Sequence, residues 1–173
     1  WVVTDDFWRR VEPRIPVRQR SAGKEYVRFA WPTQRVEDGR GHTIGFVMPL
    51  MNFQHTRSMV TYTERRESQR FLTPDQRSLP RRLAVCANLC ALMSDLHSQG
   101  HAFVDFKDQN VRVYPENDLV GFIDTDGFRI QDSSSRYFPG QHTTPTFNSP
   151  ESVRGPKSAL GEYHDRFVLA ILL

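Results

Sequence analysis

The clearest helical pattern in the chain lies between Pro80 and Gln99. Apolar and half-polar residues recur there at spacings of three and four, the period of one helix face. These residues are Leu83, Cys86, Leu89, Cys90, Met93, Leu96 and His97. Proline suits the first turn of a helix and glycine suits its end, so Pro80 and Gly100 support the same limits. The pattern predicts a helix over 80–99 that packs this face into the core.

Two short apolar segments farther along predict a β-hairpin. Residues 110–114 alternate apolar and polar side chains, 119–123 are mainly apolar, and a four-residue turn lies between them. If Tyr114 opposes Leu119, paired residue numbers sum to 233 and Asn110 lies opposite Ile123. Asn110 and Asp124 then lie together at the open end of the hairpin. Strict alternation would turn their side chains to opposite faces, so they converge only if one has left the ladder or the register slips by one.

The other segments give weaker patterns. Residues 26–51 predict a strand, a turn at 37–41 and a buried strand over 43–51, where proline ends the pairing. Residues 1–30 are irregular, because Pro13 and Pro16 interrupt any helix. We expect a short helix and a loop over 52–79, a long ordered loop over 131–160 and an apolar helix that begins at Arg166.

Composition and charge exclude some classes of protein. The chain has 173 residues and a net charge of +3, and its apolar runs are too short for a membrane span. Arginines are densest over 63–82, but acidic residues dilute them and aromatic residues are few, so nucleic-acid binding has weak support. Cys86 and Cys90 fit a helix core better than a metal site, and a cytoplasmic location is the expectation. The chain starts at Trp1 and ends on an apolar run, so we expect a part of a longer protein.

Three oxygen-bearing side chains stand out by their positions. Asp105 and Asn110 form an Asp-x-x-x-x-Asn pattern, which is weak alone. The pattern follows the predicted helix and its glycine, and Asn110 starts the hairpin that ends at Asp124. A carboxylate, an amide and a second carboxylate at one edge suit Mg²⁺, which takes few protein oxygens and leaves the rest to phosphate and water. The alternative is a polar, turn-rich edge with no chemistry, with Lys107 as a solvated surface residue.

In these segments the chain resembles the protein-kinase superfamily. Residues 96–110 resemble its catalytic loop, and 123–126 resemble its magnesium-binding Asp-Phe-Gly segment. Residues 149–151 are similar to its Ala-Pro-Glu segment, 165–170 to the start of the helix that anchors the catalytic loop, and 45–51 to the strand and hinge between its lobes. The sequence of 29–32, the Met-Pro hinge and the Asp-x-Asp variant resemble a divergent bacterial branch of Ser/Thr kinase-like proteins.

This resemblance implies an α+β fold with part of a kinase-like architecture. Residues 1–51 would be the remnant of a β-rich N-lobe with the hinge, and 52–173 the first half of a mainly helical C-lobe with the catalytic loop and activation segment. The implied activity is Mg-assisted transfer of phosphate from ATP to Ser or Thr hydroxyls of a protein substrate. The roles implied for single residues are a base at Asp105, a γ-phosphate contact at Lys107, Mg²⁺ ligands at Asn110 and Asp124, and adenine contacts at Met48, Pro49 and Met51.

Departures from the family pattern leave a second function open. Phe103 and Val104 replace the usual His-Arg, so we expect that phosphorylation of 133–135 or 143–146 is not required for activity. The glycine-rich loop and the lysine–glutamate pair are not recognisable, and Lys24 and Glu25 are poor candidates because they are adjacent. We expect those parts, and further domains, outside this chain, which alone would be inactive. The alternative to the enzyme is a pseudokinase that acts as a nucleotide-sensing binding module; a small-molecule kinase is a third reading.

Overall fold

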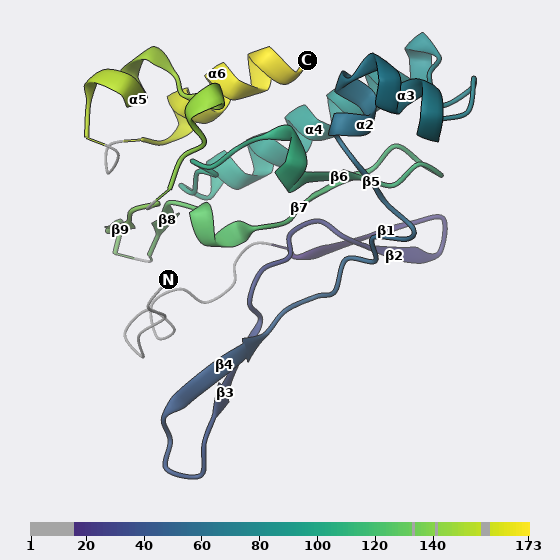
Figure 1. Ribbon diagram of the computed structural model, residues 1–173. Coiled ribbons are helices and arrows are strands. Elements are labelled where there is room, and N and C mark those ends of the chain that lie inside the picture. The colour runs from purple at the N-terminus through teal and green to yellow at the C-terminus, as the bar shows by residue number, and fades with distance from the viewer. Residues whose placement is uncertain (1–15, 133, 141, 157–159) are drawn as a thin grey trace.

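The protein combines short antiparallel sheets with helices, as a computed structural model shows (Figure 1). The structure describes residues 16–132, 134–140, 142–156 and 160–173. Its strands are β1 (Arg18–Ser21), β2 (Lys24–Val27), β3 (Gln34–Glu37), β4 (Thr43–Val47), β5 (Arg57–Ser58), β6 (Val111–Val113), β7 (Val120–Phe122), β8 (Ile130–Gln131) and β9 (Tyr137–Phe138). Its helices are α2 (Val60–Thr63), α3 (Arg65–Phe71), α4 (Leu79–Ser98), α5 (Pro150–Arg154) and α6 (Glu162–Leu172). The expected α+β class is confirmed at this level.

The first strands form a hairpin that the sequence did not predict. β1 and β2 pair antiparallel from Arg18 opposite Val27 to Ser21 opposite Lys24. Ala22 and Gly23 both have positive φ, 47° and 77°, which is the backbone of a tight two-residue hairpin turn. The expectation of an irregular segment over 1–30 is therefore wrong for 18–27. Its first fifteen residues lie outside the described part of the chain.

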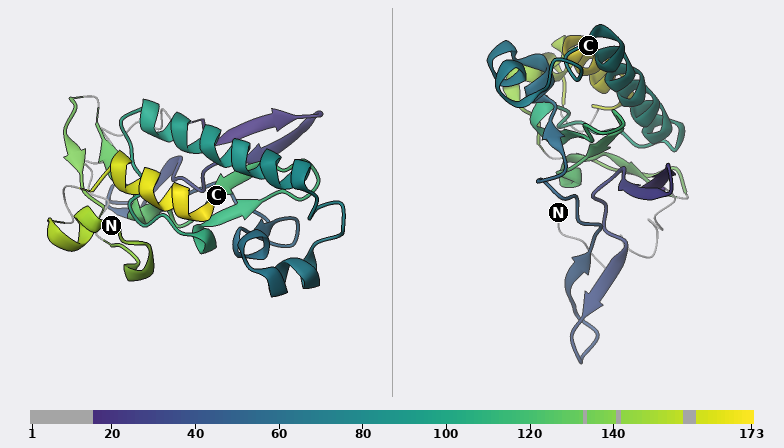
Figure 2. Two further views of the ribbon diagram at one scale, coloured as in Figure 1. Left: turned by 90° about the horizontal axis from the view of Figure 1, so that it is seen from above. Right: turned by 90° about the vertical axis from the view of Figure 1, so that its right-hand side faces the viewer.

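The second hairpin confirms the predicted strand, turn and strand but not the predicted burial. β3 pairs with β4, which ends at Val47 rather than at residue 51. Ile44 is 67% exposed and Phe46 44%, so the prediction of a buried strand is wrong. The hairpin projects away from the body in two perpendicular views (Figures 1 and 2). A two-stranded ribbon that projects in this way leaves both of its faces open to solvent.

The long helix is confirmed almost to the residue, but its buried face is rotated. α4 runs from Leu79 to Ser98, against the predicted 80–99. Its buried side chains are Val85, Leu89, Leu92, Met93 and Leu96. Leu83 is 58% exposed, and Cys86 and Cys90 are only half-buried. The helix packs against β7, and this tertiary contact selects a face slightly different from the one that the sequence pattern suggested.

The predicted hairpin of β6 and β7 has the predicted register. Val111 pairs with Phe122, Arg112 with Gly121 and Val113 with Val120, so every pair of numbers sums to 233. The carbonyl of Asn110 accepts a hydrogen bond of 3.0 Å from the N–H of Ile123. β5 adds a third, antiparallel strand beside β6 that the sequence did not predict.

Residues 28–30 run along the other edge of β7 and join the N-terminal hairpins to this sheet. Phe122 donates its N–H to the carbonyl of Arg28 at 2.7 Å and accepts the N–H of Ala30 at 2.9 Å. Phe29 and Phe122 then pack edge to face, with ring centroids 5.7 Å apart. Phe103, Phe106 and Phe128 complete this aromatic core. The segment that carries Asp105 therefore lies directly on the centre of the core.

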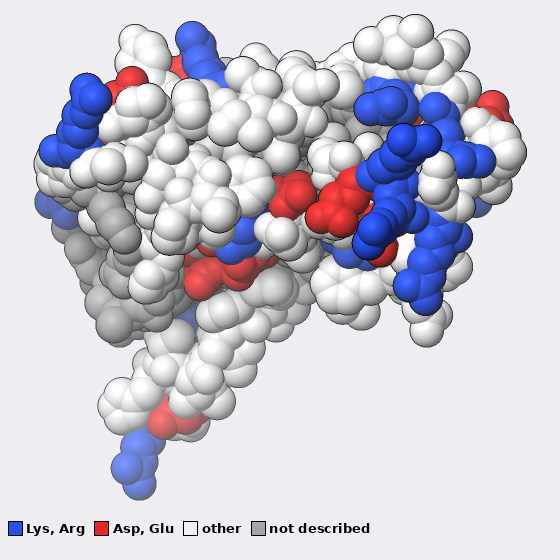
Figure 3. All heavy atoms as spheres, turned by 45° about the horizontal axis from the view of Figure 1, so that its top comes forward, with Lys and Arg blue, Asp and Glu red and all other residues white. Residues whose placement is uncertain are grey.

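The C-terminal third contains more structure than the expected long loop. β8, β9, a 3-10 turn at Pro145–Phe147 and the helix α5 fall within 131–160. The final helix, α6, is confirmed but begins at Glu162, four residues before Arg166. Among the described residues, no helix is long and apolar enough to cross a membrane. Basic side chains gather at the α3 end of the molecule (Figure 3).

Candidate functional site

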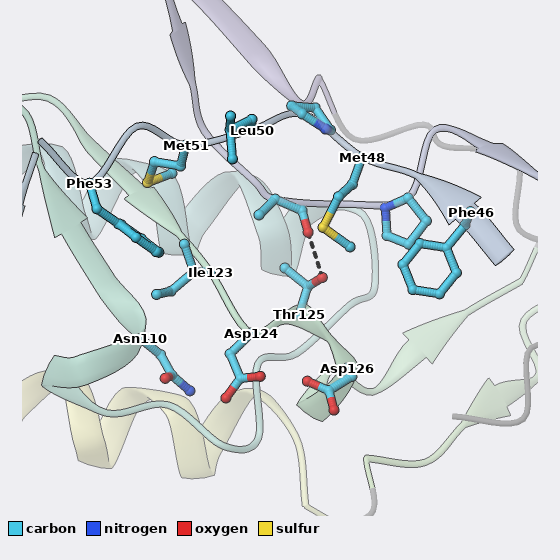
Figure 4. A pocket seen from close by; sticks show the side chains of 13 residues that line it. Phe46, Met48, Leu50, Met51, Phe53, Asn110, Ile123, Asp124, Thr125 and Asp126 are labelled. Atoms are coloured by element: carbon cyan, nitrogen blue, oxygen red, sulfur yellow. Dashed lines mark hydrogen bonds between the residues drawn. The ribbon is translucent and has the colours of Figure 1, made fainter. Parts of the chain in front are cut away.

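A cavity of about 710 Å³ lies between the segment that follows β4 and the open end of the β6–β7 hairpin (Figure 4). Its walls come from two distant parts of the sequence. The lining residues are Ala30, Pro32, Phe46, Met48, Pro49, Leu50, Met51, Phe53, Asn110, Ile123, Asp124, Thr125 and Asp126. One side is apolar, and the other carries two carboxylates and an amide, so the cavity suits a ligand with a flat apolar part and a polar part.

The apolar side holds all three residues expected to contact adenine. Met48, Pro49 and Met51 line the cavity, together with the rings of Phe46 and Phe53. Met51 and Pro49 are buried, whereas Met48 is 40% exposed. Apolar walls with a few polar groups are typical of small-molecule sites.

The polar side brings Asn110 and Asp124 together without any slip in register. Asn110 ends a 3-10 turn over Asp108–Asn110, immediately before β6 begins. Asp124 follows β7 in a left-handed conformation, with φ of 59°, and opens the 3-10 turn Thr125–Gly127. The Asn110 carbonyl still accepts the Ile123 N–H, whereas the left-handed Asp124 has left the ladder, which is the first of the two alternatives that the hairpin pattern left open. Their side chains turn toward the same end of the cavity (Figure 4).

Asp126 adds a second carboxyl group beside Asp124 that the sequence did not mark as a ligand. Burial raises the pKa of Asp124, and the hydrogen bond to Asp126 and the charge of Asp126 raise this pKa further. The positive charge of Lys107 lowers it and the charge of Asp105 raises it, which places both groups near Asp124. Crowded carboxyl groups of this kind are a condition that a bound cation relieves. The only sequence signal was that Asp126 stands where the resembled family has glycine.

Asp105 and Lys107 lie beside the cavity rather than in its lining, and they contact each other. The Lys107 ammonium lies 2.7 Å from Asp105 Oδ2. The Thr144 hydroxyl donates to Asp105 Oδ1 at 2.7 Å and accepts from Lys107 Nζ at 3.1 Å. Asn110 Nδ2 donates to the backbone carbonyl of Asp105 at 3.1 Å. A hydroxyl group therefore already occupies the position between the carboxylate and the ammonium. No sequence pattern marks Thr144 as part of the site.

The backbone before Asp105 is held by two neighbours from α6. Val104 has φ of 65°, an outlier for a β-branched residue. The buried carboxylate of Asp165 accepts the N–H groups of Phe103 and Val104 at 2.7 and 2.9 Å. The His164 ring contacts the Val104 carbonyl at 2.9 Å. These contacts fix the strained backbone, and with it the position of Asp105.

The remaining candidates fall outside this arrangement. Lys24 and Glu25 lie on β2, where Glu25 pairs with Arg18. Cys86 and Cys90 are free thiols on α4. In the described part of the chain, no three His, Cys, Asp or Glu side chains form a group that could hold a metal ion by themselves. A cation at the cavity would therefore need Asn110, the ligand's own oxygens or water as well.

Comparisons with known proteins do not assign the chain. No model of a protein family matches it, and no curated protein matches it.

Proposed function

We propose that this protein has a kinase-like fold and transfers phosphate from Mg·ATP to Ser or Thr hydroxyls of a protein. The observation that supports this most strongly is the single cavity that combines Met48, Pro49 and Met51 with Asn110 and Asp124. These residues come from distant segments, and the resemblance implies adenine contacts for the first three and Mg²⁺ ligands for the other two. The proposed lobes remain 1–51 and 52–173, and ATP supply favours the cytoplasm.

The donor set fits a hard divalent cation. Asn110, Asp124 and Asp126 present only oxygen ligands suited to Mg²⁺, and the two carboxyl groups already crowd each other. When bound, the ion would neutralise charge on the phosphates and orient them. The apolar wall would hold the adenine ring, and burial there would exclude water from one side of the nucleotide.

The residues beside the cavity would carry the proton and the charge. Asp105 would accept the proton of the substrate hydroxyl, which would replace the Thr144 hydroxyl at Asp105 Oδ1. Lys107 would compensate negative charge on the γ-phosphate from its place beside Asp105. Thr144 would then position both side chains while the site is empty.

A nucleotide-sensing pseudokinase is the second candidate, and one observation favours it. Among the described residues that line the cavity, none is lysine or arginine. A nucleotide would therefore meet no cation from these walls, apart from Lys107 nearby. Such a site could bind a nucleotide without transferring its phosphate.

Replacement of Asp105 by Asn decides between these functions. The experiment uses the protein at its full natural length and measures ATP-dependent phosphorylation of a Ser/Thr protein substrate. Loss of a general base should lower turnover by ~10²–10⁴-fold, with nucleotide affinity nearly unchanged. Asp75→Asn makes the same chemical change at a side chain that is 78% exposed, and it should leave turnover as in the wild type.

Equal turnover in wild type and Asp105→Asn would remove Asp105 from the mechanism. Binding of Mg·ATP by the wild type without any turnover would support the pseudokinase instead.

A further inference from the structure

Two arginines on neighbouring strands share one backbone carbonyl outside the cavity. Arg57 of β5 donates to the Thr56 carbonyl at 3.2 Å, and Arg112 of β6 donates to the same oxygen at 3.1 Å. Arg112 also donates from Nε to Thr56 Oγ1 at 3.1 Å, and Arg57 donates to the Gln54 carbonyl at 3.4 Å. Two cationic groups are therefore held close together on neutral acceptors.

Within the part of the chain that the structure describes, the arginine pair Arg57 and Arg112 has no carboxylate as a counter-ion. In the described residues, no carboxylate forms an ion pair with either guanidinium. Partial burial and the charge of Arg57 lower the pKa of Arg112, as expected where two like charges are close. The Nε and one terminal nitrogen of Arg57, and one terminal nitrogen of Arg112, make no hydrogen bond to the described protein. An anion would accept hydrogen bonds from these nitrogens and relieve the repulsion between the two guanidinium groups.

The pair stands at the rim of the cavity. The Arg112 guanidinium stacks on the Phe53 ring at 4.7 Å, and Phe53 lines the cavity. Neither arginine belongs to the lining, so the molecule that fills the cavity would not reach the pair directly. Arg112 follows Asn110 by two strand residues, about 7 Å at ~3.3 Å per residue. The anion should therefore belong to a second molecule that lies beside the first.

The surroundings favour a peptide as that second molecule. β5 leads directly into α2 and α3, where basic side chains gather on the surface (Figure 3). Phe53 is 59% exposed, but the Arg112 guanidinium already stacks on its ring. The proposed function takes a polypeptide as its second substrate, so a peptide is the molecule expected beside the cavity. Planar, forked guanidinium groups bind carboxylates and phosphates with paired hydrogen bonds.

We propose that Arg57 and Arg112 bind an acidic or phosphorylated side chain of the polypeptide substrate. The proposal deepens the proposed function, because it names the substrate class of the same site as acidic peptides. The subsite itself needs only peptide binding and can be tested without turnover.

The test compares two synthetic Ser-containing peptides that differ only by Glu against Gln at several positions. Fluorescence anisotropy at fixed low salt measures their affinity for wild type, Arg57→Gln and Arg57→Gln/Arg112→Gln at full natural length. Each lost arginine should weaken the affinity for the acidic peptide by about tenfold and leave the affinity for the Gln peptide unchanged. Arg66→Gln makes the same change at an exposed arginine of α3 outside the pair and should change affinity less than about twofold.

Equal affinity of the two peptides for the wild type, or equal weakening by Arg66→Gln, would overturn the subsite. If a single-stranded oligonucleotide bound more tightly than the acidic peptide, and if this binding needed both arginines, the subsite would be one for nucleic acid and the proposal would be wrong. The single variant Arg57→Gln keeps the test valid if the double variant misfolds, because the Arg57 side chain hydrogen-bonds to loop carbonyls near it in sequence rather than to the core. Mg·ATP binding is measured in parallel: its absence from the wild type would contradict the proposed function, whereas loss of peptide preference alone would contradict only the subsite.

Discussion

Asp124 is the residue where conformation and charge are both unfavourable in the free protein. Its φ of 59° places a non-glycine residue in the left-handed region, and burial together with the neighbouring Asp126 carboxyl group raises its pKa. Strain and like-charge crowding of this kind cluster at functional sites, where a ligand relieves them. The proposed role of Asp124 in binding would therefore come at the expense of the stability of the empty protein.

Replacement of Asp124 by Asn should therefore stabilise the empty protein at neutral pH. The raised pKa means that ionisation of Asp124 disfavours the folded state at pH values above that pKa. The gain should be roughly 0.5 kcal/mol, since solvent screens this partly exposed group. As pH falls through the raised pKa and below the ordinary value of 3.8, Asp124 becomes protonated in the folded and then in the unfolded state, and the gain should vanish. Urea unfolding at pH 7 and pH 3.5 measures this difference.

Asp38 supplies a control of opposite sign. Hydrogen bonds from the backbone N–H groups of His42 and Arg40 lower the pKa of Asp38, so its ionisation favours the folded state. Asp38→Asn should lower stability at pH 7. A gain for Asp124→Asn that persists unchanged at pH 3.5 would contradict the charge argument.

At this scale the sequence predicted the site residues better than their contacts. Asp105, Asn110 and Asp124 follow from their places after a helix and around a hairpin, which local periodicity defines. Thr144 and His164 enter through contacts across 39 residues for Asp105–Thr144 and 60 for Val104–His164. Local patterns carry no information about such distances.

Strand β7 is the element on which the site depends most. Residues 28–30 pair with one edge of it, β6 pairs with the other edge, and α4 packs against it. Gly121 allows the backbone to approach this closely, because a Cβ there would lie 2.5 Å from both the Val27 carbonyl and Met51 Cε. Met51 lines the cavity, so crowding at Gly121 would reach the candidate nucleotide site.

Gly121→Ala should destabilise the protein by about 2 kcal/mol, because the Val27 carbonyl is backbone and cannot rotate away. Gly45→Ala is the matched control on β4, where a Cβ would meet no atom within 4 Å. Chemical denaturation of both variants measures the difference. Equal stability of the two variants would show that the close approach at Gly121 is not needed.

Elements defined by local periodicity were predictable, and those defined by distant contacts were not. The register of the β6–β7 hairpin, in which paired residue numbers sum to 233, follows from a pattern within 14 residues. The limits of α4 follow from a pattern within 20 residues. The edge contact of 28–30, the strand β5 and the exposure of β4 depend on what lies beside each segment in space. The rotated face of α4 has the same origin, since its contact with β7 selected it.

At the scale of the whole molecule, the cavity is lined by two stretches that are distant in the sequence. Residues 30–53 supply the apolar wall, and residues 110–126 supply the oxygen ligands. The aromatic core formed by Phe29, Phe122 and Phe128 connects them. This arrangement explains how one ligand could contact both stretches. It predicts that the contributions of the apolar wall and of the oxygen ligands to binding depend on each other.

Isothermal titration of ATP into the full-length protein, with and without Mg²⁺, tests the central claim most directly. We expect binding that Mg²⁺ strengthens at least tenfold in the wild type, and that loses this dependence in Asp124→Asn because a carboxylate ligand is gone. The same weak affinity with and without Mg²⁺, or an unchanged Mg²⁺ dependence in Asp124→Asn, would contradict the assignment of this cavity as a Mg·ATP site.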